Sequence, residues 1–97
     1  MSVSSDLLNL YKRSIGDFNL DENALDEYYK VFLNAAYADL ISDDISEENL
    51  NSDLGKSLTC LYAEALMNKA DIANNPTITL LKNKLSIMTK GDDFANV

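Results

Sequence analysis

The sequence predicts an all-α fold, a small bundle of about four helices with two long central helices and shorter first and last helices. Its length of 97 residues suits a single hydrophobic core. The chain is 46% hydrophobic but has only three glycines and one proline, too few turn formers for a many-stranded β protein. Apolar residues recur at helical spacing along most of the chain. We therefore expect residues 1–97 to form one helical domain.

The first helix is expected to begin near Ser4 or Ser5, because a serine side chain can accept a hydrogen bond from an unpaired N–H of the first turn. It should end at Gly16, since glycine commonly follows a helix C-terminus. Its apolar residues share one face, which we expect to join the core: Leu7, Leu8, Tyr11 and Ile15.

A long second helix is expected over about residues 19–42, because residues 19–22 have the spacing of a capping box. Its apolar residues cover roughly 200° of the helix, wider than the ~100° stripe of a surface helix, so it should be central. Asp39 lies on this arc near the C-terminal end, where we expect the arc to have left the core. The arc consists of Leu25, Tyr28, Tyr29, Val31, Phe32, Leu33, Ala35, Ala36 and Leu40.

Residues 42–49 lose the periodicity and gather turn formers and acids, which predicts the main loop. Its four carboxylates could suggest a cation site. The alternating ligands and the central glycine of a calcium loop are missing, however. We therefore expect a solvated loop and no bound metal.

A third helix is expected from about Ser52 to Asp71, with a core side and a strip of small residues on its back. Another helix could approach closely along that strip. Cys60 lies in it and is expected to be a buried small hydrophobe, because the chain has no histidine to activate the thiol. The core side is Leu54, Leu58, Leu61, Tyr62 and Ala65, and the strip is Thr59, Cys60, Ala63, Met67 and Ala70.

The fourth helix should start at Asn75 and Pro76, since asparagine can cap and proline suits the first helical position. It should run to about Lys90, where Gly91 stops it, and residues 91–97 should form a flexible C-terminal tail. The expected core stripe is Ile78, Leu81, Leu85 and Met88. Leu80 and Ile87 lie two turns apart on the opposite side, which predicts a contact with another molecule.

The charge is uneven along the chain. The net charge is −8, but residues 1–53 hold 12 acids and 3 bases, for −9, and residues 54–97 hold 4 acids and 5 bases, for +1. The acidic half can act simply as a solvated face that maintains solubility, or it can meet the lysine side of another copy. In the second case the lysines are Lys69, Lys82, Lys84 and Lys90, and the predicted interface residues are Leu80, Ile87, Lys82 and Lys84.

Several functional classes are disfavoured by composition. The absence of histidine and the single cysteine remove most zinc sites and the usual nucleophile and base pairs. The three glycines are far apart and form no phosphate-binding loop. The acidic balance argues against binding the nucleic-acid backbone through a broad basic surface. No apolar run reaches the ~18 residues of a membrane span, and the N-terminus has no signal-peptide pattern. We therefore expect no enzyme, no cofactor, no membrane contact and a soluble cytosolic chain.

Two short alternatives remain open. Residues 53–58 resemble the Asp-Leu-Gly-x-Asp-Ser-Leu attachment loop of acyl carrier proteins, which implies Ser57 as a phosphopantetheine site, although one residue of that motif is missing and Lys56 replaces its aspartate. A small acidic phage inhibitor or DNA mimic would also be negative and helical, although the near-neutral second half weakens that idea.

The whole plan resembles the small head-tail connector, or head completion, proteins of tailed bacteriophages over about residues 4–90. The likeness rests on the short first helix at residues 7–16, the polar turn after it and the long helix at residues 28–40. It continues in the second long helix, which includes residues 55–63, and in the last helix, which follows residues 75–76.

The resemblance implies a structural adaptor without catalytic residues. Copies of such a protein form a ring on the portal after DNA packaging, extend the channel and provide a platform for a head-closure or neck protein. DNA would be only passing cargo, and the location would be the virion neck after assembly in the host cytoplasm. An acidic channel would repel DNA and let it slide.

Overall fold

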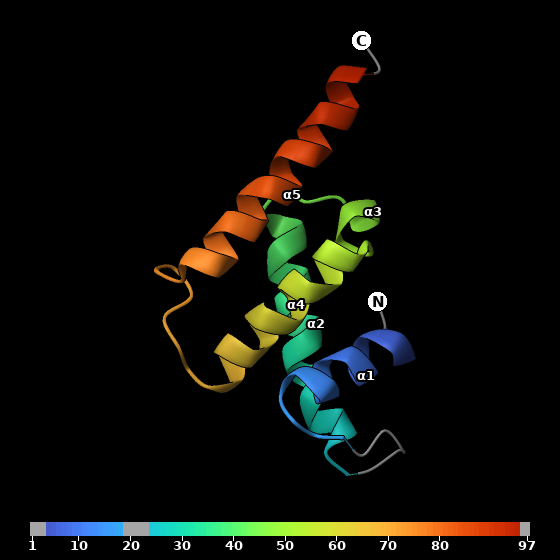
Figure 1. Cartoon of the computed structure of the whole chain (residues 1–97), viewed down its shortest axis with the longest axis vertical. Helices are drawn as coiled ribbons and strands as arrows, with labels where there is room; N and C mark the ends of the chain where they lie inside the picture. The colour runs from blue at the N-terminus through green and yellow to red at the C-terminus, as the bar shows by residue number, and fades with distance from the viewer. Residues whose placement is uncertain (1–3, 19–23, 96–97) are drawn as a thin grey trace.

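The computed structural model describes the backbone of residues 4–18 and 24–95 and the side chains of these residues up to residue 90. The described chain is all-helical and has no strand, which confirms the predicted fold class (Figure 1). The elements in chain order are α1 Ser5–Ser14, α2 Asp26–Ser42, α3 Glu47–Leu50, α4 Asp53–Met67 and α5 Pro76–Ala95.

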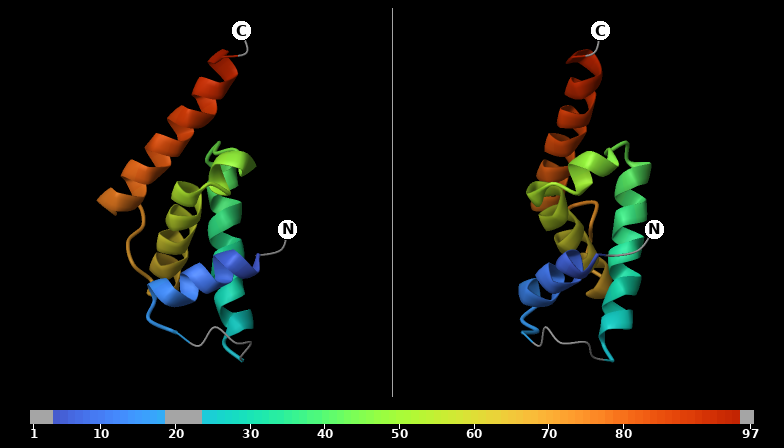
Figure 2. Two further views of the ribbon diagram at one scale, coloured as in Figure 1. Left: turned by 45° about the vertical axis from the view of Figure 1, so that its right-hand side comes forward. Right: turned by 90° about the vertical axis from the view of Figure 1, so that its right-hand side faces the viewer.

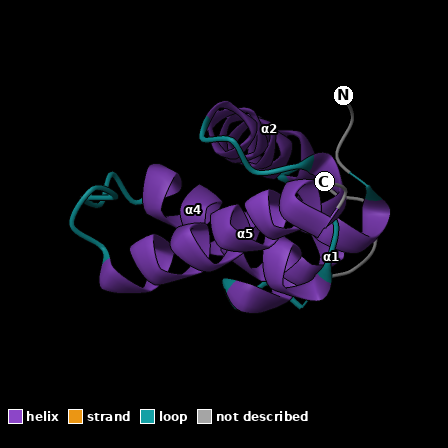
Figure 3. Cartoon of the chain, turned by 90° about the horizontal axis from the view of Figure 1, so that it is seen from above, coloured by secondary structure: helices purple, strands orange, loops and turns teal. Residues whose placement is uncertain are grey.

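Helix α4 lies at the centre of the arrangement, and α1, α2, α3 and α5 all pack against it. In the side views, α2 and α5 lie on different sides of α4, and the C-terminal end of α5 extends beyond the rest of the molecule (Figure 2). Seen from above, α2 is viewed nearly end-on beside α4 and α5 (Figure 3). Helix α4, the third helix predicted from the sequence, is thus central as expected. Helix α2 packs on only one side of α4.

Side-chain caps begin three of the helices at the starts that the sequence predicts. The Ser4 hydroxyl accepts a hydrogen bond from the Leu7 N–H at 3.1 Å at the start of α1. Ser52 does the same for Gly55 at 3.2 Å at the start of α4, and the Asn75 side chain caps α5 just before Pro76. The capping box predicted at residues 19–22 lies outside the described residues, and α2 begins at Asp26.

Three predicted boundaries are wrong. The loop at residues 42–49 contains the start of α3, which Ser46 caps. The third predicted helix ends at Met67 rather than Asp71, because Lys69 adopts a left-handed φ of 55° that reverses the chain. Gly91 does not stop the last helix, since a glycine inside a helix costs only about 1 kcal/mol. Helix α5 continues to Ala95 and, at 20 residues, is the longest described helix rather than a short one.

Much of the predicted core is confirmed, but six of its apolar residues are exposed. Leu61 in α4 is 37% exposed and Met88 in α5 is 43% exposed. The other four belong to the arc predicted for the second helix: Leu25, Tyr28, Val31 and Ala35. The buried core joins all five helices and contains Leu7, Leu8, Tyr11, Tyr29, Leu33, Ala36, Tyr37, Leu40, Ile45, Leu50, Leu58, Cys60, Tyr62, Ala63, Ala65, Ile78 and Leu85.

Helix α3 sits so close to α4 that only glycine fits at position 55. A Cβ atom on Gly55 would lie 2.5 Å from Leu50 Cα and closer still to the Asn49 carbonyl oxygen. Both are backbone atoms, which cannot rotate away. The glycine of the carrier-like string therefore has a packing explanation in this fold.

Helix α3 is also tied to α5. The Thr89 hydroxyl oxygen accepts hydrogen bonds from the Asn49 side-chain amide at 2.6 Å and from the Ser46 N–H at 3.2 Å. The same hydroxyl donates to the Leu85 carbonyl oxygen at 2.9 Å. Moving α3 would therefore disturb its contacts with both long helices beside it.

A buried ion pair joins α1 to α2. The Lys12 Nζ atom lies 2.9 Å from Asp26 Oδ1, and the two side chains are 1% and 9% exposed. Next to it, the Tyr11 and Tyr29 rings meet edge to face with centroids 5.6 Å apart. Isolated buried charges are strongly disfavoured, so the pairing lowers the cost of burying both groups.

Candidate assembly surfaces

Helix α5 has an apolar line on its solvent side. Leu80 is 66% exposed and Ile87 is 69% exposed, whereas Ile78 and Leu85 on the other side are 1% and 0% exposed. The exposed Lys84 lies between them, one turn from each. We call Leu80, Lys84 and Ile87 the α5 outer face. The predicted outward position of both apolar residues is confirmed.

The structure separates Lys82 from this face. Its Nζ atom lies 2.7 Å from Asp43 Oδ2 at the C-terminal end of α2, and the two side chains are 31% and 41% exposed. Lys82 therefore stabilises the arrangement of α5 relative to α2 within one chain. Of the two predicted interface lysines, only Lys84 lies on the α5 outer face.

Helix α2 has a second exposed apolar surface. Tyr28 is 50% exposed and Val31 is 62% exposed, and Ala35 and Ala38 are exposed on the following turns. These four residues are called the α2 outer strip. Successive residues turn by about 100°, which places the strip roughly opposite the buried Leu33 and Tyr37.

Sequence reasoning missed this strip because it assigned the whole wide apolar arc of α2 to the core. One packed neighbour covers only about 100° of a helix, so an arc of roughly 200° leaves room for a second contact. The width of the apolar arc was therefore the feature of the sequence that could have indicated a second contact surface on this helix.

Acidic groups lie at both ends of the α2 outer strip. Glu27, Val31, Ala35 and Asp39 follow one another at intervals of four residues, so they form one row along the helix. The Glu27 side chain is 84% exposed and contacts Lys30 at 3.2 Å. Asp39 is exposed, as predicted, and accepts a hydrogen bond from the Tyr62 hydroxyl at 3.1 Å.

Most of the α5 segment carries the opposite charge. Residues 72–90 contain three lysines and no acid, and Asp92 and Asp93 follow near the end of α5. Lys82 is paired internally, while Lys84 and Lys90 are exposed on α5. The uneven charge seen along the sequence thus places an acidic helix and a basic helix on different sides of α4.

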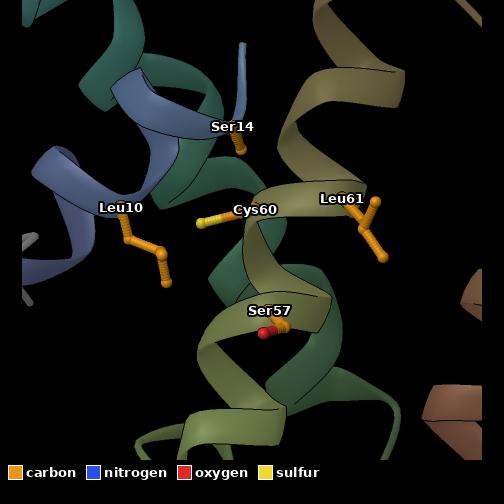
Figure 4. A pocket seen from close by; sticks show the side chains of 5 residues that line it. All are labelled: Leu10, Ser14, Ser57, Cys60 and Leu61. Atoms are coloured by element: carbon orange, nitrogen blue, oxygen red, sulfur yellow. The ribbon is translucent and has the colours of Figure 1, made fainter. Parts of the chain in front are cut away.

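A small apolar pocket lies between α1 and α4 (Figure 4). Its volume is about 270 Å³, and it is lined by Leu10, Ser14, Ser57, Cys60 and Leu61. Cys60 is 4% exposed, which confirms the predicted burial. Burial, followed by the nearby Glu64 carboxylate, raises the pKa of the Cys60 thiol to about 12. The thiol is therefore protonated at neutral pH and is a poor nucleophile.

The carboxylates of residues 43–48 form no metal centre. Asp43 pairs with Lys82, and Asp44 has a left-handed φ of 66°. Within the described ranges, no cluster of three or more histidine, cysteine, aspartate or glutamate side chains could hold an ion. None of the described helices is both long and apolar enough to span a membrane.

No family model, no curated protein and no solved structure matches the chain.

Proposed function

We propose that this chain is a structural assembly protein, a head-tail connector that forms a ring on the portal of a tailed bacteriophage and joins the DNA-filled head to the neck and tail. The observation that supports it best is the presence of two exposed apolar helix faces on one small domain, one with acids at its ends and the other with an exposed lysine. The α5 outer face exposes two large aliphatic side chains, at 66% and 69%. Two large aliphatic side chains aligned in water on one helix are typical of a contact surface.

The order of the helices supports the same proposal. The short α1, the long α2, the central α4 and the final helix after Asn75 follow the plan that resembles the connector proteins. In such a ring, the exposed acids of residues 43–48 would repel passing DNA if they faced the channel, so DNA would slide without binding.

Co-sedimentation with the portal protein encoded by the same genome tests this function. Purified chain and purified portal are mixed, centrifuged through a density gradient and examined by negative-stain electron microscopy. The proposal expects the chain to move with the portal and to add a ring of density at one end. A chain that stays at the top of the gradient at every ratio contradicts it. The gene should also lie shortly after portal and capsid genes.

Two other functions give different results in simple assays. The Ser57 hydroxyl is exposed beside the α1–α4 pocket, so a phosphopantetheinyl transferase could reach it if the chain were a carrier protein. Intact mass after incubation with such an enzyme and coenzyme A would then increase by one phosphopantetheine group, and Ser57→Ala would abolish the increase. A DNA mimic would instead form a 1:1 complex with a DNA-binding protein.

A further inference from the structure

We infer that the α5 outer face of one copy packs on the α2 outer strip of a second copy, so that copies join head to tail. This inference rests on the proposed function and names the two surfaces through which the ring would close. The occupant of each face is therefore the other face of an identical chain.

The two faces match in shape and length. Leu80 and Ile87 are large, and Ala35 and Ala38 are small, so the aliphatic side chains of α5 can enter the shallow side of α2. The α2 outer strip covers ten steps along its helix, about 15 Å at 1.5 Å per residue, so the seven steps from Leu80 to Ile87, about 10.5 Å, fit within its length.

Charge favours this pairing over the symmetric ones. The α5 side presents exposed Lys84 and Lys90, and the α2 side presents exposed Glu27 and Asp39. Two α5 faces packed together would place lysines against lysines, and two α2 strips would place acids against acids. Like charges across an interface oppose association, whereas the mixed pair is complementary.

The positions of the faces exclude their pairing within one chain. Helices α2 and α5 both pack on α4, and the residues of the α5 outer face and of the α2 outer strip are exposed to solvent within the chain. A contact between unlike faces leaves one of each kind free on every dimer. Such a contact adds further copies and closes into a ring when the rotation permits.

Two variants separate these pairings. Leu80→Glu with Ile87→Glu adds acids to the α5 outer face, and Val31→Lys with Ala35→Lys adds bases to the α2 outer strip. All four positions are exposed, and glutamate and lysine are good helix formers, so both variants should fold. Far-UV circular dichroism checks this. Thr79→Glu is a matched control, because Thr79 is exposed on α5 about 100° around the helix from Leu80.

Sedimentation velocity then measures each variant alone and the two mixed. Each variant alone should be monomeric, and Thr79→Glu should assemble like the wild type. The mixture keeps a native α2 strip on one variant and a native α5 face on the other, so it should form a 1:1 dimer and nothing larger. Raising the salt concentration should weaken that dimer, because exposed charges are screened over about 10 Å at 0.1 M.

Three results would overturn the inference. They are a mixture that stays monomeric, self-assembly of the α2 variant through α5 alone, and a wild type that is monomeric up to about 1 mM. The portal experiment fails separately. A mixed dimer without portal binding would support the head-to-tail contact and contradict the connector function. Portal binding without the mixed dimer would support the connector function and contradict the head-to-tail contact.

Discussion

Replacing Gly55 by alanine tests the packing of α3 on α4. The added Cβ would lie 2.5 Å from Leu50 Cα, whereas ordinary van der Waals contacts begin at 3.4 Å. Helix α3 must therefore move by roughly 1 Å, and its hydrogen bonds to Thr89 resist that movement. Overpacking of this kind costs typically 1 to 3 kcal/mol and sometimes more, and a rigid backbone neighbour favours the upper end.

The gain in helix propensity from glycine to alanine offsets about 1 kcal/mol of that cost. We therefore expect a net loss of about 2 kcal/mol, which lowers the Tm by roughly 8 to 16 °C for a domain of this size. Thermal and urea unfolding followed by circular dichroism measure it. Ser57→Ala on the exposed side of the same helix is the control and should change the stability little. A Gly55→Ala protein as stable as the wild type would refute the close approach of the two helices.

Three further predictions concern buried polar groups. Lys12→Met should lower the free energy of unfolding by about 3 to 5 kcal/mol, because it removes the ion-pair partner of the buried Asp26 carboxylate. Adding Asp26→Leu should restore most of that loss in urea titrations, and equal instability of the single and double variants would contradict this. The Cys60 thiol should react with a disulfide reagent at pH 8 far more slowly in the native protein than in denaturant, because burial raises its pKa to about 12; rapid native labelling would place it in solvent. Burial also raises the pKa of Tyr11 and of Tyr62 from 10.0 to about 12. The folded state therefore holds these two protons more tightly than the unfolded state, so their contribution to the free energy of unfolding is complete below pH 10 and is lost as the pH rises towards 12. Unfolding curves measured at alkaline pH should show this loss, and a free energy of unfolding that does not change from pH 9 to 12 would exclude it.

Local signals in the sequence predicted most of the helix starts. Ser4, Ser52 and Asn75 cap helices where expected, because a cap depends on one side chain and the next three residues. Helix ends were harder to place. Helix α4 ends beside a left-handed Lys69, which is not a residue type that marks such a turn, and α5 passes through Gly91 because a glycine inside a helix costs only about 1 kcal/mol.

The candidate surfaces were predicted unevenly. Leu80 and Ile87 were found because they lie opposite a clear core stripe on the same helix. Lys82 was misplaced because its partner Asp43 follows the end of α2, far away in the sequence, and no sequence spacing shows such a pair. The α2 outer strip was missed because periodicity shows which residues are apolar but not which of them a neighbour covers.

The central claim is that copies of this chain assemble through the exposed side of α5. Sedimentation velocity over a range of concentrations, comparing the wild type with Leu80→Glu and Ile87→Glu together, tests it most directly. Each apolar side chain buried at a contact contributes about 1.5 to 3 kcal/mol, so the double change should weaken association by a factor of roughly 10² to 10⁴. The account predicts a wild type that assembles with rising concentration and a folded variant that remains monomeric. Unchanged assembly of the folded variant would contradict it.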